Sequence, residues 1–268
     1  MIKLVCTDID GTLVPDGTDK INPEIFDVIL ELKEKGIMFV AASGRQYASM
    51  KDLFLPVAKD MIFISEGGNL VTCREEIMAI SKMKKEDVEK AIRDIESIPD
   101  CEALASGASV SYAKEGSEEL IDLMTNGYHY NLEVVSDLLS VVDKDIIKVS
   151  MFQKDGRADE ILENYMKEQW KDQDRIELIC AGKEWIDCIN RGSNKGTAIK
   201  QIQELMKISP QETMVFGDNL NDLHMMARAK YSFAVKNARS EVKEAANFIA
   251  DTNLNDGVLK ELKKLLKA

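Results

Sequence analysis

The chain has 268 residues, of which 45% are hydrophobic and 31% charged, and its formal net charge is −12. This length allows one large domain or two modest ones, and the composition supports a sizeable core and excludes a disordered chain. The negative charge argues against nonspecific binding to nucleic acid or to an anionic membrane, so an anionic substrate would need a local positive site.

Cysteine usage and the apolar runs favour a cytoplasmic protein. The five cysteines are odd in number and widely spaced, which is typical of reduced thiols rather than of a disulfide framework or a zinc site. No apolar run approaches 18 residues, and the first residues lead directly into a strand pattern instead of a secretory leader. We therefore predict a cytoplasmic location and no membrane partner, whereas nothing in the pattern indicates an oligomeric state.

The chain begins with a short apolar run that ends in two carboxylates. Residues 3–7 predict a buried strand, and Asp8 and Asp10 follow at its carboxyl end. A spacing of two puts both carboxylates on one side of an extended chain, and Gly11 allows the backbone to turn sharply. Such close carboxylates repel each other unless a cation or a shared proton is present, so the stretch is either an acidic turn or a cation site.

A loop, a helix and a second strand follow. Residues 15–22 predict a polar loop, and the asparagine, proline and glutamate at 22–24 predict a helix start in which the asparagine caps the helix and the proline takes its first position. Gly36 predicts the helix end, and residues 37–42 form an apolar run typical of a parallel strand. Strand, helix and strand together indicate the βαβ unit of a doubly wound fold.

Ser43 and Gly44 follow the second predicted strand. A hydroxyl and the backbone N–H groups after it can bind one phosphoryl oxygen at a strand-to-helix junction, although an ordinary turn has the same pattern. The two aspartates one strand away favour phosphate binding. For Arg45, a salt bridge and a substrate contact fit the pattern equally well.

From about residue 82 to 189 the pattern changes to helical stretches that alternate with short β-like runs. It predicts helices at 85–98, 116–126 and 158–170, a hairpin at 103–112 that turns at 106–107, and strands at 146–153, 176–181 and 185–190. We therefore predict a core formed by residues 1–81 and 190–268, with an α+β module inserted at 82–189.

Lys195 is predicted in the first turn of the helix that follows the insert. A cation at this end opposes the helix dipole unless an anion lies beside it, so the position favours an anion site over an ordinary exposed lysine. Two further strands in the core, at 61–65 and 213–216, lie before and after this insert, and strands at 231–235 and 248–250 end the sheet pattern.

Asp218 follows the strand at 213–216, and Asn221 and Asp222 come three and four residues later. The latter two return to the face of Asp218 if a helix begins there. Together with Asp8 and Asp10, Asp218 supplies the hard oxygen ligands that suit Mg²⁺, and a helix-capping role is the alternative for it.

The segments 8–13, 43–45, 192–199 and 217–222 resemble, in this order, the four motifs of the haloacid dehalogenase superfamily of phosphotransferases. With the long insert, the chain resembles the Cof-type sugar-phosphate phosphatases of that superfamily, and the insert matches a C2-type cap of the C2B form. The resemblance implies an α/β fold with a doubly wound parallel-sheet, Rossmann-like core and an inserted α+β cap. It also implies Mg²⁺-dependent hydrolysis of small phosphomonoesters, such as sugar phosphates and related metabolites, through an aspartyl-phosphate.

The resemblance implies a role for each residue of these motifs. Asp8 is the nucleophile, and Asp10 is the general acid and then the general base. Mg²⁺ is held by Asp8, Asp218 and the backbone carbonyl of Asp10. The phosphoryl oxygens are bound by Ser43, Lys195, Asn221 and the backbone N–H groups of Ile9 and Gly44, and the site is supported from behind by Asp222 and Thr12.

Two alternatives remain open from the sequence. A phosphomutase of the same superfamily also keeps Asp10, whereas dehalogenases and phosphonatases lack this second aspartate. A signalling module that accepts a phosphate on Asp8 and releases it slowly is disfavoured by the cap-like insert. The chain also departs from many Cof-like sequences, which have Asn-Gly where this one has Gly67 and Gly68.

Overall fold

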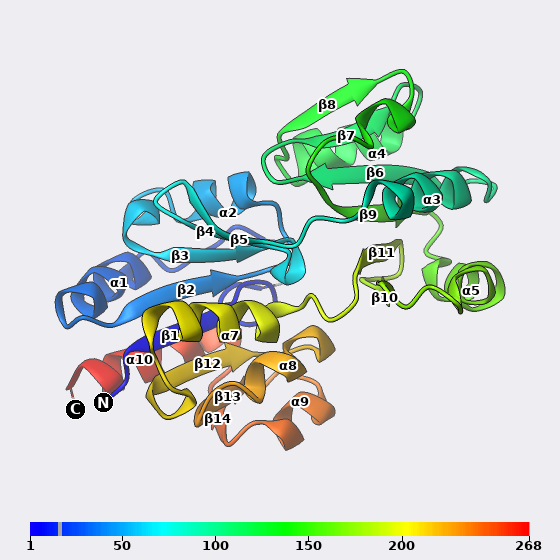
Figure 1. Ribbon diagram of the computed structural model, residues 1–268. Helices are drawn as coiled ribbons and strands as arrows, with labels where there is room; N and C mark the ends of the chain where they lie inside the picture. Colours follow the sequence, from blue (N-terminus) through cyan, green and yellow to red (C-terminus); the bar gives the residue numbers. More distant parts are fainter. Residues whose placement is uncertain (16–17, 268) are drawn as a thin grey trace. The chain divides into compact units, whose positions relative to one another are not determined.

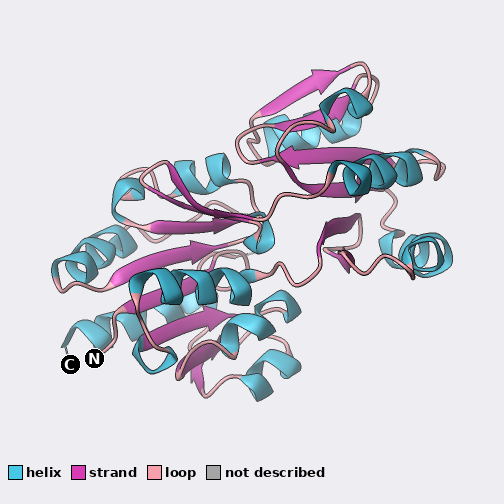
Figure 2. Ribbon diagram, in the orientation of Figure 1, coloured by secondary structure: helices cyan, strands magenta, loops and turns pink. Residues whose placement is uncertain are grey.

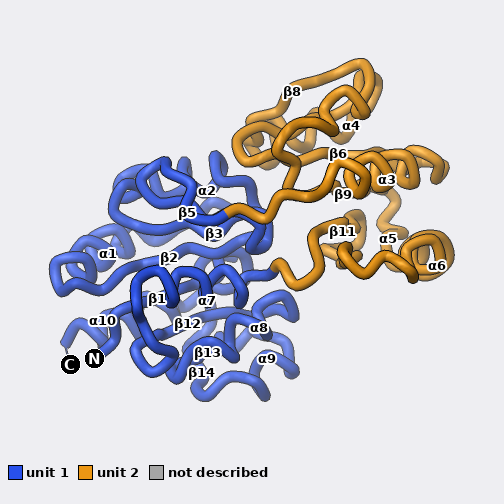
Figure 3. Tube along the Cα trace, in the orientation of Figure 1, with its two compact units in different colours: residues 1–79, 194–268 blue, residues 80–193 orange. Residues whose placement is uncertain are grey.

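The computed structural model describes residues 1–15 and 18–267. The chain separates into two compact units, one formed by residues 1–79 and 194–268 and the other by residues 80–193 (Figure 3). The sequence prediction puts the insert at 82–189, whereas this unit begins at residue 80 and ends at residue 193. That the second unit serves as a cap remains a prediction.

The first unit is built on an eight-stranded sheet (Figures 1 and 2). Its strands are β1 (Leu4–Asp8), β2 (Met38–Ala42), β3 (Ile62–Ser65), β4 (Leu70–Cys73), β5 (Glu76–Ile80), β12 (Thr213–Gly217), β13 (Tyr231–Val235) and β14 (Phe248–Ala250). Their order is β14-β13-β12-β1-β2-β3-β4-β5. The strands from β14 to β3 are parallel to their neighbours, and β4 runs antiparallel to β3. This confirms the predicted doubly wound parallel sheet.

Helices cover both faces of this sheet. They are α1 (Glu24–Glu34), α2 (Tyr47–Leu53), α7 (Lys195–Met206), α8 (Leu223–Met226), α9 (Ser240–Ala245) and α10 (Gly257–Lys267). The crossovers from β1 to β3 and from β12 to β14 move along the sheet in opposite directions, so right-handed connections place α1 and α2 on one face and α8 and α9 on the other. The order therefore reverses between β1 and β12, and ligands of such sheets bind beyond the strand ends at this point.

The strands around β1 are apolar on both faces because both faces are covered. All five residues of β1 are buried, and one apolar cluster joins the strands to the inner sides of α1, α7 and α10. The predicted strand boundaries shift slightly, since β1 ends at Asp8 and β3 begins at Ile62. The prediction for α1 was wrong by one residue: the helix begins at Glu24, whose N–H donates to the Asn22 side chain.

The second unit contains a six-stranded sheet in the order β10-β11-β9-β6-β7-β8. Its strands are β6 (Glu102–Gly107), β7 (Ser111–Lys114), β8 (Leu132–Val135), β9 (Ile146–Phe152), β10 (Ile176–Cys180) and β11 (Trp185–Asn190). Its helices are α3 (Lys85–Glu96), α4 (Glu118–Asp122), α5 (Ala158–Ile161) and α6 (Lys167–Trp170), and wider π-type turns at residues 123–127 and 162–166 extend α4 and join α5 to α6. The predicted α+β character of the insert is confirmed.

The observed elements differ from the sequence prediction in one turn and in several strands. The hairpin of β6 and β7 turns at residues 108–110 rather than 106–107, because β6 pairs with β9 through Gly107. The strands β4, β5 and β8 were not predicted, and β5 and β8 lie at the edge of a sheet. Both are largely apolar but only four or five residues long, and so short an apolar run cannot be assigned to a strand from its pattern alone.

Two other predictions concern less regular segments. The loop predicted at 15–22 contains residues 16 and 17, which lie outside the described residues. Among the helices that the structure describes, none has the length and apolar character needed to cross a bilayer.

Gly68 sits where the first unit's two chain segments meet. It ends the turn η2 (Glu66–Gly68), its φ is 116°, and a Cβ atom there would lie 2.3 Å from the carbonyl carbon of Asn194. Gly67 has a φ of 69° and no atom within 4 Å of a Cβ position. Only Gly68 therefore needs to be glycine for the turn to pack against the start of α7, beside Lys195.

Gly68→Ala should lower the free energy of unfolding by at least about 2 kcal/mol, because both the backbone conformation and the contact with Asn194 must change. Gly67→Asn is the matched control and should change it by less than about 1 kcal/mol, since asparagine tolerates the left-handed conformation. Urea denaturation measures both, and equal losses would contradict this account.

Candidate active site

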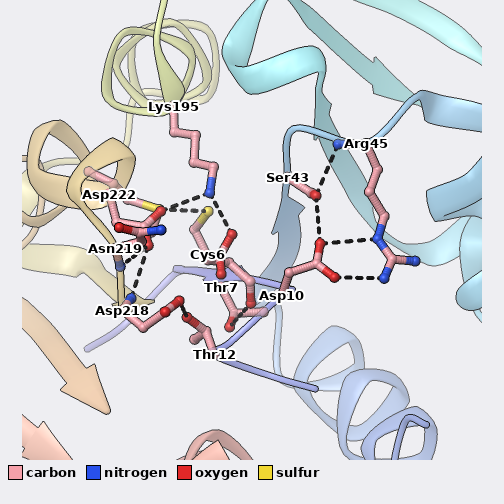
Figure 4. A network of polar contacts seen from close by, with 12 residues as sticks. Cys6, Thr7, Asp10, Thr12, Ser43, Arg45, Lys195, Asp218, Asn219 and Asp222 are labelled. Carbon is pink, nitrogen blue, oxygen red and sulfur yellow. Dashed lines mark hydrogen bonds and ion pairs between the residues drawn. The ribbon is translucent and has the colours of Figure 1, made fainter. Parts of the chain in front are cut away.

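Three polar side chains lie at the carboxyl ends of neighbouring strands. Asp8 ends β1, Ser43 follows β2, and Asp218 follows β12. Asp8 pairs in register with Ala42, and Thr7 pairs with Phe216, so these strands end at the same edge of the sheet. The network of polar contacts in Figure 4 is built from these ends and from the start of α7.

Lys195 is the centre of one half of this network. It is the first residue of α7, and its side chain is only 1% exposed. Its ammonium donates to Asp8 Oδ1 at 2.5 Å and to Asp222 Oδ1 at 2.8 Å (Figure 4). The acceptors of this ammonium are therefore two aspartates of the protein itself, and the binding of a phosphate beside it stays a prediction.

Asp222 is held by backbone groups as well as by the lysine. Its Oδ2 accepts the N–H of Asp218 at 2.9 Å and the N–H of Asn219 at 3.1 Å. It ends the short turn η7 (Leu220–Asp222), and a Cβ atom at Gly217 would lie only 2.6 Å from its Cβ. These contacts hold the Asp222 carboxylate in one orientation, and through them it supports the turn that carries Asp218.

The electrostatics of this half are dominated by burial. Burial raises the pKa of Asp8 well above its ordinary value, and the carboxylates of Asp222 and Asp218 add to this effect while Lys195 opposes it. Burial by itself would lower the pKa of Lys195, but Asp222 and Asp8 outweigh it and the pKa is raised. The ammonium therefore stays charged, and one cation does not fully offset the buried carboxylates around it.

The donor set fits a divalent metal ion. Asp8, Asp218 and Asp222 each offer an oxygen, and these oxygens all lie within 4.8 Å of one another. Oδ2 of Asp8 is buried and has no hydrogen-bond partner among the described residues. A hard cation such as Mg²⁺ would satisfy this oxygen. Asp222 already accepts three hydrogen bonds, so Asp8 and Asp218 are the better ligands.

Asp10 belongs to the other half of the network. Arg45 Nη2 donates to Asp10 Oδ1 at 2.6 Å, and Arg45 Nε donates to Asp10 Oδ2 at 3.0 Å. The Ser43 hydroxyl lies 3.3 Å from the same Oδ2 and accepts the backbone N–H of Arg45 at 3.1 Å. Asp8 and Asp10 are two residues apart in sequence, yet each has its own basic partner.

Most of the predicted site residues are near one another. Thr12 donates to Asp218 Oδ1 at 2.6 Å, the side chain of Ile9 is buried in the core, and Gly44 is exposed beside Ser43. Asn221 differs, because its side chain is exposed on the turn η7 (Leu220–Asp222).

Sequence reasoning missed some residues that organise the site. It left the partner of Arg45 open, and it did not single out Asn219, whose side chain accepts the N–H of Leu220, or Asn237, which donates to the carbonyl of Gly11 at 2.7 Å. Neither asparagine lies in a pattern that marks it, because each acts on a backbone group of a turn.

Comparisons with known proteins agree with this geometry. The family model of haloacid dehalogenase-like hydrolases matches residues 5–262. The 5-amino-6-(5-phospho-D-ribitylamino)uracil phosphatase YbjI of Escherichia coli is 29% identical over 269 residues, which cover 99% of this chain and 97% of that protein. A crystal structure from Eubacterium rectale has a TM-score of 0.90 and 35% identity, covering 98% of this chain and 99% of its own. The structure of a haloacid dehalogenase subclass IIB sugar phosphatase has a TM-score of 0.77 and 23% identity, covering 98% of each chain. This similarity supports the fold and nothing further.

The chain belongs to the haloacid dehalogenase-like hydrolases. Within that family it is a Cof-type phosphatase, an enzyme that hydrolyses phosphoric monoesters. The family and the reaction type implied by the sequence motifs are thereby confirmed.

Lys195→Met should lower the free energy of unfolding by about 3–5 kcal/mol in the presence of a chelator, because it leaves two buried carboxylates without a cation. Lys200→Met is the matched control on the same helix. Lys200 is exposed and faces Glu204 at 3.7 Å, so its loss should cost less than about 0.5 kcal/mol. Urea denaturation compares the two, and equal stabilities would show that Lys195 does not hold the site together.

Proposed function

We propose that this phosphatase is Mg²⁺-dependent and that it hydrolyses small phosphomonoesters through an aspartyl-phosphate on Asp8. The observation that carries the proposal is the environment of the Asp8 carboxylate. One of its oxygens accepts from a buried lysine, and the other is buried beside Asp218 without a hydrogen-bond partner in the part of the chain that the structure describes. A carboxylate in this setting has a fixed orientation and is shielded from water.

The metal site is assigned to Asp8, Asp218 and the backbone carbonyl of Asp10. When bound, Mg²⁺ offsets the repulsion between the nucleophile and the phosphoryl oxygens and polarises the phosphoryl group. The Asp10 carboxylate is paired with Arg45, so we assign the backbone carbonyl of Asp10, and not its side chain, as the metal ligand. Thr12 and Asp222 orient the turn that carries Asp218.

The chemistry is assigned to the two aspartates of the first motif. Asp8 attacks phosphorus, and the bond from phosphorus to the leaving oxygen breaks while Asp10 gives that oxygen a proton. Water then attacks the aspartyl-phosphate, Asp10 takes the proton of this water, and phosphate and free Asp8 are released. One residue thus serves as acid in the first step and as base in the second.

The remaining motif residues are assigned to the phosphoryl oxygens. Ser43 and Lys195 lie on either side of the strand end that carries Asp8, and each has a donor there. The backbone N–H groups of Ile9 and Gly44 complete the proposed set. Asn221 keeps its proposed role, for which its exposed position on η7 leaves the side chain accessible to a ligand.

The substrate class is proposed from the relatives and from the insert. The name of the Escherichia coli relative describes a substrate with a phosphate on a ribityl chain. We extend this to phosphate esters of sugars and sugar alcohols, with residues 82–189 as the cap that contacts the leaving group. We retain the cytoplasmic location, predicted from the cysteines, as part of the proposal.

Activity should disappear after exhaustive chelation and return with Mg²⁺. Phosphate release from a panel of sugar and sugar-alcohol phosphates measures this, and the absence of an isomerised ester separates hydrolysis from a mutase reaction. Mg²⁺ should also raise the melting temperature of the wild-type protein and raise that of Asp218→Asn much less, because binding to the folded state stabilises it. Full activity in the chelated sample would refute the metal assignment.

Asp8→Asn and Asp10→Asn should fail in different ways. Asp8→Asn removes the nucleophile and should form no phosphoenzyme. Asp10→Asn removes the acid and base, a contribution of about 10²–10⁴-fold, but a nitrophenyl leaving group needs little protonation. Asp10→Asn should therefore release a burst of roughly one nitrophenol per chain, followed by slow turnover.

An alkyl sugar phosphate is the control for this experiment. Its leaving group needs the acid, so Asp10→Asn should give no comparable burst with it. Rapid-quench kinetics record both substrates. Similar nitrophenol bursts from the two variants would show that the roles of Asp8 and Asp10 are assigned wrongly.

A further inference from the structure

Arg45 engages the Asp10 carboxyl with two nitrogens. Nη2 donates to Oδ1 and Nε donates to Oδ2, so each oxygen receives one N–H of the planar guanidinium (Figure 4). This fork determines both the position and the plane of the carboxyl group. The burial of Arg45 strengthens the pair, since its side chain is only 12% exposed.

The same guanidinium reaches the loop after the first motif. Nη1 donates to Asp19 Oδ1 at 2.6 Å, and Nη2 also donates to the carbonyl of Thr18 at 3.1 Å. Arg45 therefore joins the Asp10 carboxyl to residues 18–19, which lie eight and nine positions further along the chain. Its backbone N–H adds a contact to the Ser43 hydroxyl, which itself donates to Asp10 Oδ2.

The number of N–H donors that Arg45 already uses distinguishes a role in binding substrate from a role in positioning Asp10. A guanidinium has five N–H groups. One on Nε, both on Nη2 and one on Nη1 are used in the contacts above, which leaves one N–H. A side chain that recognises a phosphate or a sugar needs several free donors, so these contacts favour positioning over substrate binding.

We propose that Arg45 is a positioning residue that sets the orientation of the Asp10 carboxyl and ties it to the loop segment Thr18–Asp19. The inference rests on the proposed function, in which Asp10 serves as acid and base. Asp8 needs no such help, because Lys195 and the strand end already hold it. Asp10 lies two residues past the end of β1 and its side chain is 32% exposed, so without the fork it would sample several rotamers.

The consequence is a selective effect on substrates whose leaving group needs a proton. Replacing arginine by lysine keeps a positive charge but removes the planar fork, so Asp10 keeps a partner and loses its fixed plane. Misplacement of a catalytic group by about 1 Å can cost on the order of 10²-fold in rate. An alkyl ester should show this loss in kcat, whereas a nitrophenyl ester should show little of it in the first step.

Arg45→Lys should lower kcat for an alkyl sugar phosphate by roughly 10²-fold and change the nitrophenol burst rate by less than about threefold. Asp19→Asn removes only the contact of Nη1 with a carboxylate that is 59% exposed. It should lower kcat for the alkyl ester by at most about fivefold. We expect kcat for the alkyl ester to be lowest in Arg45→Lys, higher in Asp19→Asn and highest in the wild type. Circular dichroism checks that each variant is folded.

Arg93→Lys is the matched control. Arg93 donates with Nε and Nη2 to Glu89 on the exposed face of α3, far along the chain from the motifs, and its replacement should leave both substrates unaffected. Equal losses in the rate of phosphoenzyme formation from the alkyl and nitrophenyl esters in Arg45→Lys would overturn the proposal, since a general structural defect slows that first step for both. A fall in Asp19→Asn as large as that in Arg45→Lys would overturn it too, because the fork would then not be the main contact.

The outcome for Arg45 is separable from the outcome for the proposed function. If wild-type protein forms no phosphoenzyme, or if Asp8→Asn forms it, the aspartyl-phosphate mechanism fails. If wild type and Asp8→Asn behave as expected and Arg45→Lys slows phosphoenzyme formation from both esters alike, only the positioning role fails.

Discussion

The rest of the site depends on one buried ion pair network, in which the Lys195 ammonium lies between Asp8 and Asp222. Taking three charges out of water is costly, and such a cluster persists only when each charge has its partners in place. The three residues come from the end of β1, the start of α7 and the turn after β12. Their mutual pairing therefore requires that three distant parts of the chain arrive at one point, which is the point where the strand order reverses.

Several local features serve this requirement. Gly68 has no side chain where its turn meets the backbone of Asn194, and Gly217 has none where Asp222 packs against it. The side chain of Asn194 caps α7 by accepting the N–H of Thr197 at 2.9 Å, so the helix starts at Lys195 and at no later residue. The close backbone approaches at the two glycines and the cap of α7 together hold the charged side chains within hydrogen-bonding distance.

The two aspartates of the first motif show how environment separates chemically identical groups. The Asp8 side chain is 7% exposed and paired with a lysine, and burial is the largest influence on its pKa. The Asp10 side chain is 32% exposed and held by the arginine fork. A buried carboxylate with a fixed orientation suits a nucleophile. A more accessible carboxylate that is held by a separate basic side chain suits proton transfer.

The sequence by itself determined the fold class, because short apolar runs that end in polar motif residues and alternate with helical patterns are typical of buried parallel strands. It also determined Asp8, Asp10, Ser43, Lys195 and Asp218 as candidates, since each follows a strand or begins a helix. The edge strands β5 and β8 and the turn of the β6–β7 hairpin could not be predicted, because their residues are selected by pairing partners rather than by burial. Only the tertiary structure decided that Arg45 faces Asp10 and Asp19 and that Asp222 faces Lys195. The physical reason is that a charged side chain finds its partner across the fold, at separations that no local pattern along the chain records.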